Sequence, residues 1–333
     1  MNPEIEAILA AFPIGTASST EPYGKGRLHS TYHVRTADGE YILQKIGPLF
    51  NPAMKDIDSV TKHLEAKGIR TARVIPTREG ALSYGKDGGY WRLMTFIPGA
   101  TIEGNPSVPQ AENASAFIGM FHTALLDYEK SFAYHLPGYR DTPLAISHLR
   151  EADAAHETSE KYAVCHPLVV EILGRAKKLS AEIATLPKRT LHGDLKLNNL
   201  RFDADGTHAI ALIDFDTLGR YTLPLEIGDM LRSWCTTPSY TLDLSVWQTS
   251  IRGYRSEAHF VTADEWRLIP DGLAEITLSL AARYCADAYE EKYFAHDPAY
   301  VSLFEQNAER TKRYLAVLTD FDRNEESIRT MHA

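Results

Sequence analysis

The chain has 333 residues, an apolar fraction of 44% and a formal net charge of −9. A general nucleic-acid binder neutralises phosphates with clustered basic residues, and the sequence has no basic tract, so we exclude that class. The apolar part of the N-terminus is too short for a signal peptide, and no run reaches the roughly 18 apolar residues of a membrane span, so we expect a cytoplasmic protein with no membrane partner.

The first third of the sequence reads as a β-rich unit. Four runs, STYHVRT, EYILQKI, RVIPT and YWRLMTFI, have the composition of strands, and the turn sequences ADGE and REGA lie between them. One helical pattern interrupts the strands near residues 56–67, where Ile57, Val60 and Leu64 recur at helical spacing. We therefore predict a β-rich N-terminal lobe over residues 1–97.

Long helical patterns dominate the rest of the chain, after a Pro-Gly pair that marks a hinge. Residues 108–129 form the clearest pattern, with Ser107 as the expected N-cap, and residues 274–294 form another. The prediction is an α+β fold with two lobes. A mainly helical C-terminal lobe over residues 98–333 faces the N-terminal lobe across a cleft.

Short polar side chains cluster around two apolar runs between residues 189 and 219. In LHGDLKLNN, His192, Asp194 and Asn199 have the pattern His-x-Asp-x-x-x-x-Asn, and the later run IALIDFD supplies Asp214. A hard cation such as Mg²⁺ takes oxygen ligands and keeps places for water and phosphate oxygens. Asn199 and Asp214 are therefore the predicted metal ligands.

Asp194 is the candidate proton acceptor. An aspartate near the metal but not bound to it can accept the proton of an attacking hydroxyl group, which is the role of the aspartate in the kinase catalytic loop. Lys196 brings positive charge to the transferring phosphoryl group. We expect His192 to brace the loop through a backbone hydrogen bond. The alternative for the cluster, a set of Asx-turns and caps, explains two ordered motifs less well.

The motifs HGDLKLNN and IDFD resemble the catalytic and metal motifs of the aminoglycoside phosphotransferase-like kinases of small molecules. The wider pattern, which includes YILQKI, WRLMTFIPG, GDMLR and ARYCADAYEEKYF, is most similar to the N-acetylhexosamine 1-kinases and extends from about residue 24 to residue 314. The resemblance implies a protein-kinase-like fold. It also implies ATP and Mg as the cofactors and a small-molecule hydroxyl compound as the substrate.

Two segments of the N-terminal half are candidates for nucleotide binding. In YGKGRLHSTYHV, Gly24 and Gly26 precede a strand, where the resemblance implies a loop that covers the phosphates; hairpin glycines are more often simple turn formers. In the hinge segment LMTFIPG, the resemblance implies that backbone groups of Thr95 and Ile97 pair with adenine.

The strand EYILQKI should carry a side chain to the α- and β-phosphates. Gln44 and Lys45 are neighbours, so in a regular strand only one of them faces the cleft. Charge favours Lys45, whereas the register of the wider family also permits Gln44. We predict Lys45, with Glu65 of the following helix as its ion-pair partner; a solvated charge on the helix surface is the alternative for Glu65.

A sugar pocket needs mixed carboxylate and guanidinium partners. The candidates are Arg140 and Asp141 in YRDTP, Glu226 in LPLEIGDMLR, and Arg283 and Asp287, which lie one helical turn apart. For the segment around Glu226, bracing of the catalytic loop is an equal alternative. For the Arg–Asp pair the alternative is support of the helix surface.

These residues predict a kinase that transfers the γ-phosphate of ATP to a small molecule, and the resemblance implies the anomeric hydroxyl of an N-acetylhexosamine or related sugar as the first acceptor. The alternatives are a kinase for homoserine, choline, methylthioribose or an aminoglycoside, and a nucleotide-binding pseudokinase. A protein kinase is disfavoured because Asp-Phe-Gly and Ala-Pro-Glu motifs are missing from the sequence. The oligomeric state is left open.

Overall fold

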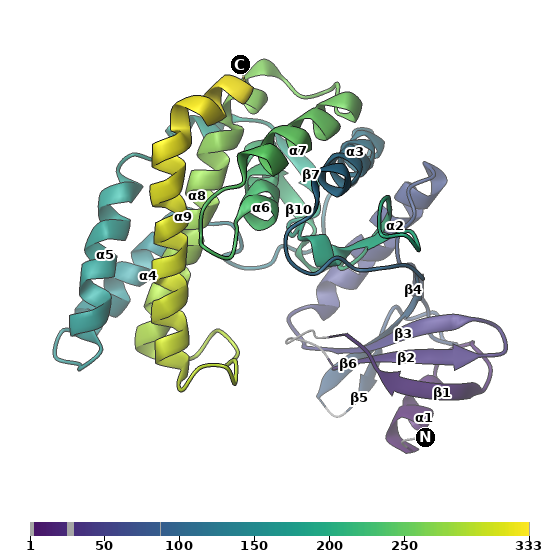
Figure 1. Cartoon of the computed structure of the whole chain (residues 1–333). Coiled ribbons are helices and arrows are strands. Elements are labelled where there is room, and N and C mark those ends of the chain that lie inside the picture. The colour runs from purple at the N-terminus through teal and green to yellow at the C-terminus, as the bar shows by residue number, and fades with distance from the viewer. Residues whose placement is uncertain (1–2, 25–29, 87, 333) are drawn as a thin grey trace.

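The computed structural model describes residues 3–24, 30–86 and 88–332, and it has two lobes (Figure 1). The N-terminal lobe is built on an antiparallel sheet with the strand order β1-β2-β3-β6-β4, and β5 also pairs with β6. Its elements are α1 (Pro3–Leu9), β1 (Ala17–Pro22), β2 (Ser30–Thr36), β3 (Glu40–Ile46), α2 (Met54–Ala66), β4 (Val74–Ile75), β5 (Tyr84–Lys86) and β6 (Gly89–Thr95).

The two faces of this sheet have different roles because side chains alternate along each strand. Leu43 and Trp91 point to one face, where they pack into a core cluster with the apolar side of α1. Their chain neighbours Gln44 and Arg92 are directly paired across β3 and β6 and point to the other face, toward the C-terminal lobe. The register of this strand pair thus decides which side chains reach the cleft.

The C-terminal lobe is mainly helical, and its long helices pack in pairs. Helix α3 packs on α7, whereas α8 packs on both α6 and α9 (Figure 1). The helices are α3 (Val108–Ala124), α4 (Thr142–Ala155), α5 (Tyr162–Ala176), α6 (Leu223–Cys235), α7 (Leu244–Glu257), α8 (Ala263–Glu290) and α9 (Leu303–Met331). In the described part of the chain, none of the helices combines the length and apolarity needed to cross a bilayer.

Two short antiparallel strand pairs hold the functional loops of this lobe. Strand β7 (Lys188–Leu191) pairs with β10 (Gly219–Thr222), and β8 (Leu200–Phe202) pairs with β9 (Ala209–Leu212). The loop 192–199 therefore runs from β7 to β8, and the loop 213–218 runs from β9 to β10. Both loops are fixed at both ends by strands of the same two ladders.

The predicted α+β division into a β-rich lobe and a mainly helical lobe matches the observed elements. The strands STYHVRT and EYILQKI have the predicted bounds, and α2 covers most of the predicted helix at 56–67. The Gln110 side chain accepts a hydrogen bond from the Ser107 backbone N–H, so Ser107 caps α3 as expected. The segment between β6 and α3 contains the proposed lobe boundary at residue 97.

Helices α6 and α8 approach each other so closely that glycine is required at their crossing. A Cβ atom built on Gly272 of α8 would overlap the carbonyl oxygen of Pro224, and one built on Gly228 of α6 would overlap the backbone of Leu273. Since α6 carries residues that contact the catalytic loop, this crossing also positions the site.

We predict that Gly272→Ala lowers the free energy of unfolding by about 1–3 kcal/mol, because the backbone of α6 must move away. The matched control is Gly174→Ala in α5, where a Cβ atom meets open space. That change should stabilise the chain by about 0.5–1 kcal/mol, since alanine loses less backbone entropy in a helix. Urea unfolding of the two variants measures both effects, and equal stability of the two variants would contradict the prediction.

Candidate active site

A cavity of about 770 Å³ lies between the lobes, within the range of small-molecule and cofactor sites. The N-terminal sheet contributes Gln44 and Arg92 to its lining, and the hinge contributes residues 95–97. The C-terminal lobe contributes Lys196, Asn199 and Asp214, among other residues. The cleft predicted from the sequence is therefore present, and it brings the strand, hinge and loop candidates to one place.

The loop 192–199 holds the predicted catalytic group in a defined position. The Nζ atom of Lys196 lies 2.8 Å from Oδ1 and 2.9 Å from Oδ2 of Asp194. Desolvation lowers the pKa of the Lys196 ammonium, but the attraction of Asp194 raises it by more, so the net shift is upward. The Asn199 amide donates to the Asp194 carbonyl at 2.8 Å, which closes the loop on itself.

His192 braces this loop, as expected, and its contacts define the tautomer. The ring Nε2 lies 2.9 Å from the Ile213 carbonyl, to which it donates, and Nδ1 accepts from the Asp194 backbone N–H at 3.2 Å. The ring is fully buried, and this desolvation lowers the pKa of His192 and keeps the imidazole neutral. The histidine thereby ties the loop of Asp194 to the segment that leads into Asp214.

The two predicted metal ligands lie side by side at the base of the cleft. The Ile213 N–H donates to the Asn199 carbonyl at 2.9 Å, and Asp214 follows directly in the left-handed conformation, with φ of 65°. Since the Asn199 NH₂ group donates to the loop, its amide oxygen is the atom that can ligate a cation. The donor set of one amide oxygen and one carboxylate suits Mg²⁺, which also takes water and phosphate oxygens.

No cluster of three or more His, Cys, Asp and Glu side chains that could hold a metal ion exists among the residues with described positions. A cation at Asn199 and Asp214 would therefore take its remaining ligands from nucleotide and solvent. This is the usual arrangement for Mg²⁺ in phosphoryl-transfer sites, which rarely use an all-protein cage.

The backbone at Gly193 leaves no room for a side chain. Its φ is 91°, and a Cβ atom there would overlap the carbonyl oxygen of Thr217. The Thr217 hydroxyl donates to the His192 carbonyl at 3.0 Å, and the Tyr221 hydroxyl donates to the Thr217 carbonyl at 2.9 Å. The loops that carry Asp194 and Asp214 are thus in direct backbone contact.

Glu226 and Arg140, which we predicted as acceptor residues, form a buried support for the catalytic loop. The Glu226 carboxylate accepts from the N–H groups of His192 at 3.0 Å and Gly193 at 3.1 Å. The Arg140 guanidinium lies 3.0 Å from Glu226 and donates to the Gly193 carbonyl at 2.7 Å. These contacts agree with the alternative that the segment around Glu226 braces the catalytic loop, and a contact of either side chain with the acceptor stays a prediction.

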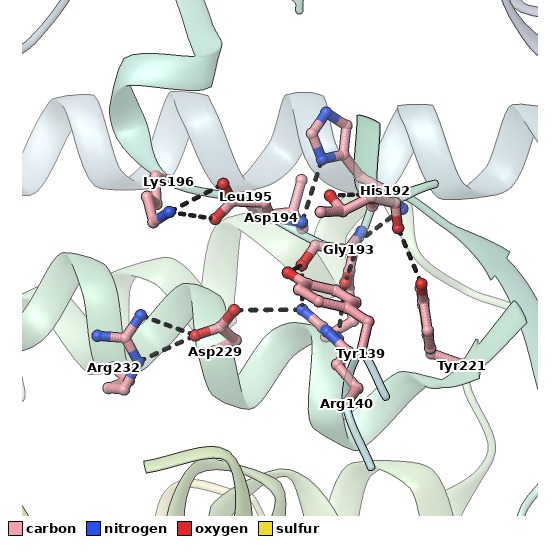
Figure 2. Close-up of polar contacts among 12 residues, drawn as sticks. Tyr139, Arg140, His192, Gly193, Asp194, Leu195, Lys196, Tyr221, Asp229 and Arg232 are labelled. Carbon is pink, nitrogen blue, oxygen red and sulfur yellow. Dashed lines mark hydrogen bonds and ion pairs between the residues drawn. The ribbon is translucent and has the colours of Figure 1, made fainter. Parts of the chain in front are cut away.

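Other side chains complete the support. Asp229 and Arg232 lie in the segment that the sequence analysis considered as a brace for the catalytic loop, whereas Tyr139 and Trp234 were not assigned this role. The Tyr139 hydroxyl donates to the Gly193 carbonyl at 2.7 Å, and the indole N–H of fully buried Trp234 donates to the Leu195 carbonyl at 2.8 Å. Asp229 lies between Arg140 at 3.2 Å and Arg232 at 2.8 Å. Figure 2 shows Asp229 and Arg232 on α6, facing Asp194 and Lys196.

The other predicted acceptor residues are occupied by structural contacts. Asp141 caps α4 by accepting from the Leu144 N–H at 2.9 Å. Asp287 is buried and accepts from the backbone N–H groups of residues 292–294 and from Asn307, so it anchors the loop after α8. Arg283 donates to the Tyr293 hydroxyl of this same loop. Asp287 therefore holds this loop, and its contact with a sugar hydroxyl stays a prediction.

An aromatic row continues from Arg232 toward this loop. The Arg232 guanidinium carbon lies 5.7 Å from the ring centre of Tyr314, which lies 5.6 Å from that of Tyr284. Tyr284 stacks on Phe294 at 3.7 Å between ring centres. We call Tyr314, Tyr284 and Phe294 the acceptor-side row, because the row starts at Arg232, in the segment LPLEIGDMLR that the sequence analysis considered for the acceptor.

The hinge and glycine candidates line the cleft as far as the structure describes them. Gly24 lines the cavity with φ of 76°, whereas Gly26 lies outside the described residues. The Thr95 N–H donates to the Arg73 carbonyl at 2.9 Å, so this N–H is already bonded. Pairing of adenine with the Thr95 carbonyl and the backbone of Ile97 stays a prediction.

The predicted Lys45–Glu65 ion pair is wrong. Lys45 pairs with Trp91 in the β3–β6 register and points to the face away from the cleft, with Nζ 5.8 Å from the Trp91 ring centre. Glu65 forms an ion pair with Arg73 at the end of α2. Gln44 lines the cavity instead. Gln44 and Lys45 are consecutive in β3, so their side chains point to opposite faces of the sheet, and the neutral Gln44 faces the cleft.

The chain belongs to the phosphotransferase enzyme family, whose model matches residues 19–260. It is therefore a phosphotransferase. It is 24% identical to the homoserine kinase of Xanthobacter autotrophicus over 262 residues, which cover 76% of each chain. It is also 24% identical to the homoserine kinase of Pseudomonas aeruginosa over 303 residues, which cover 89% of this chain and 90% of the relative.

Solved structures show the same fold at low identity. An aminoglycoside phosphotransferase from Alicyclobacillus acidocaldarius superposes with a TM-score of 0.64 at 14% identity, covering 98% of this chain and 97% of the other. The amicoumacin kinase hAmiN, solved with AMP-PNP, Ca²⁺ and Ami, has a TM-score of 0.63 at 16% identity, with coverage of 94% and 96%. The prediction of the aminoglycoside phosphotransferase-like, protein-kinase-like fold is confirmed.

The buried Glu226 carboxylate makes a testable contribution to stability. Its desolvation raises the pKa, but Arg140 and His122 lower it by more, to about 2 from 4.5. Because the folded pKa is the lower one, the stabilisation is complete above pH 4.5 and is lost as the pH falls toward 2.

We predict that Glu226→Gln lowers the free energy of unfolding at neutral pH by about 3 kcal/mol, since it leaves the buried Arg140 charge poorly paired. Urea unfolding of wild type and variant, from pH 7 to about pH 3, measures the difference. The difference in unfolding free energy between wild type and variant should become smaller below pH 4.5. A difference that does not change with pH would contradict the stabilising role of the Glu226 carboxylate.

Proposed function

We propose that the protein transfers the γ-phosphate of ATP to a hydroxyl group of a small molecule, with Mg²⁺ as the metal. The observation that carries this proposal is that Asn199 and Asp214 both line the interlobe cavity, while the Asn199 amide is hydrogen-bonded to the Asp194 carbonyl. The AMP-PNP and Ca²⁺ in the hAmiN structure support nucleotide and divalent cation use. A cytoplasmic location is part of the same proposal.

Each chain residue has a defined task in this reaction. Bound Mg²⁺, held by Asn199 and Asp214, supplies positive charge to the phosphate oxygens. Asp194 accepts the proton of the acceptor hydroxyl as that oxygen attacks phosphorus. Lys196 holds Asp194 in the free protein and lies close enough to share its charge with the phosphoryl oxygens. Glu226 keeps the loop in place through backbone contacts and takes no part in proton transfer.

Two acceptor classes have specific support. The motifs that resemble N-acetylhexosamine 1-kinases span most of the sequence, and Arg232 with the half-buried Tyr314 and Phe294 of the acceptor-side row are guanidinium and aromatic groups of the kind that bind a sugar ring. We therefore propose the anomeric hydroxyl of an N-acetylhexosamine or related sugar first. Homoserine is the second candidate because the relatives from Xanthobacter and Pseudomonas are homoserine kinases.

We predict that Asp194→Asn lowers kcat by about 10²–10⁴-fold, the range of a lost general base. The amide keeps the size of the side chain, so nucleotide affinity and the unfolding transition should change little. Asp264→Asn is the matched control, since that side chain is 74% exposed on α8. Release of ADP, coupled to an optical assay, measures turnover, and full activity of Asp194→Asn would refute its role.

The acceptor is identified by Mg²⁺-dependent ADP release with N-acetylglucosamine, N-acetylgalactosamine, other hexoses, homoserine, choline, methylthioribose and kanamycin. Phosphorus NMR of the product then distinguishes an anomeric phosphate from the phosphate of a primary alcohol. Turnover with homoserine alone would overturn the sugar proposal and keep the kinase. Bound ATP without turnover on any acceptor would favour the pseudokinase alternative.

A further inference from the structure

The predicted β3 lysine points away from the cleft, and an arginine on β6 lines the cleft instead. Arg92 is 2% exposed and lines the interlobe cavity, directly opposite Gln44 in the strand register. Among the lining residues that the structure describes, Lys196 and Arg201 are the other cations, and both belong to the C-terminal lobe. Arg92 is thus the cation that the N-terminal sheet brings to the cleft.

The Arg92 guanidinium is held from both lobes. Its Nε donates to the Gln44 side-chain oxygen at 2.9 Å, and the Gln44 amide donates to the Thr31 hydroxyl at 3.1 Å. Its two terminal nitrogens donate to the two carboxylate oxygens of Asp216, one of them at 3.0 Å. Asp216 lies two residues after the metal-ligand candidate Asp214, so the pair connects the sheet to the metal loop.

These contacts use three of the five N–H donors of the guanidinium. A further one points toward the Met54 sulfur at 3.9 Å, which is a weak acceptor. The group therefore keeps donor capacity beside the cavity while its plane is fixed by Gln44 and Asp216. A planar guanidinium with a fixed orientation is well suited to phosphate oxygens.

We infer that Arg92 binds the polyphosphate of the nucleotide, taking from β6 the role that a β3 lysine would have, with Gln44 and Asp216 as its positioning residues. This inference rests on the proposed function, because it assumes that the cleft binds a nucleoside triphosphate. The adenine at the hinge and the metal at Asn199 and Asp214 leave the phosphates between them, where Arg92 lies.

A purely structural role for Arg92 gives a different result. A buried ion pair between lobes would affect folding and all ligands of the cleft alike, whereas a phosphate contact affects only ligands that carry phosphate. The comparison of ADP with adenosine separates the two, since adenosine fills the same base and ribose positions without phosphates.

The test is calorimetric binding of Mg²⁺–ADP, together with an NMR titration of adenosine, to the wild type and to Arg92→Met, Arg92→Lys and Lys45→Met. Arg92→Met should weaken ADP by about 10- to 100-fold and adenosine by less than about twofold, the loss expected for a charge-assisted contact. Arg92→Lys should recover part of the ADP affinity. Lys45→Met removes a cation from the opposite face of the same sheet and should leave both affinities unchanged.

Thermal unfolding of each variant identifies loss of fold, and Arg92→Lys provides a charged variant if Arg92→Met unfolds. The inference would be overturned if Arg92→Met weakened the affinities for ADP and adenosine equally, or if it left the ADP affinity unchanged. Where only Arg92→Lys folds, the same two outcomes in that variant decide. Failure of the proposed function looks different, because the wild type itself would then not bind Mg²⁺–ADP.

Discussion

Glu226 accepts hydrogen bonds from two consecutive backbone N–H groups of the catalytic loop while fully buried, and the remainder of the site depends on this contact. A buried carboxylate is costly without partners, and here Arg140 supplies the compensating charge and also binds the loop. The backbone of the catalytic loop determines the position of the Asp194 side chain. This backbone cannot move without breaking its buried hydrogen bonds to Glu226 and Arg140. Helix α6 therefore acts as the foundation of the catalytic loop.

The metal loop is joined to the same foundation through backbone contacts. His192 donates a hydrogen bond to the Ile213 carbonyl, and Gly193 packs so closely on Thr217 that no side chain fits between the two loops. The candidate base and the candidate metal ligands thus belong to connected loops of the C-terminal lobe. A nucleotide in the cavity, in contrast, would contact both lobes. The position of its phosphates therefore depends on how the two lobes are arranged.

The sequence was sufficient where local pattern determines structure. Strand-like runs predicted β2 and β3, and the two ordered motifs predicted that Asn199 and Asp214 lie in one cleft. The sequence was insufficient where the side of the sheet that a residue faces, or a contact between distant segments, decides its role. Lys45 is an example, because the strand register places it on the face away from the cleft. The pairing of Arg140 with Glu226, far apart in the chain, left no local signal. A charged residue within the apolar strand run WRLMT was the available hint for Arg92.

The loop after α8 is attached by Asp287 to a helix, independently of the residues that hold the catalytic loop. It carries Phe294, the end of the acceptor-side row. Under the proposed function, a change of length or composition in residues 295–302 would alter the surface near Phe294 while the contacts that hold the catalytic loop stay in place. Acceptor choice and phosphoryl transfer could then evolve separately on one phosphotransferase scaffold.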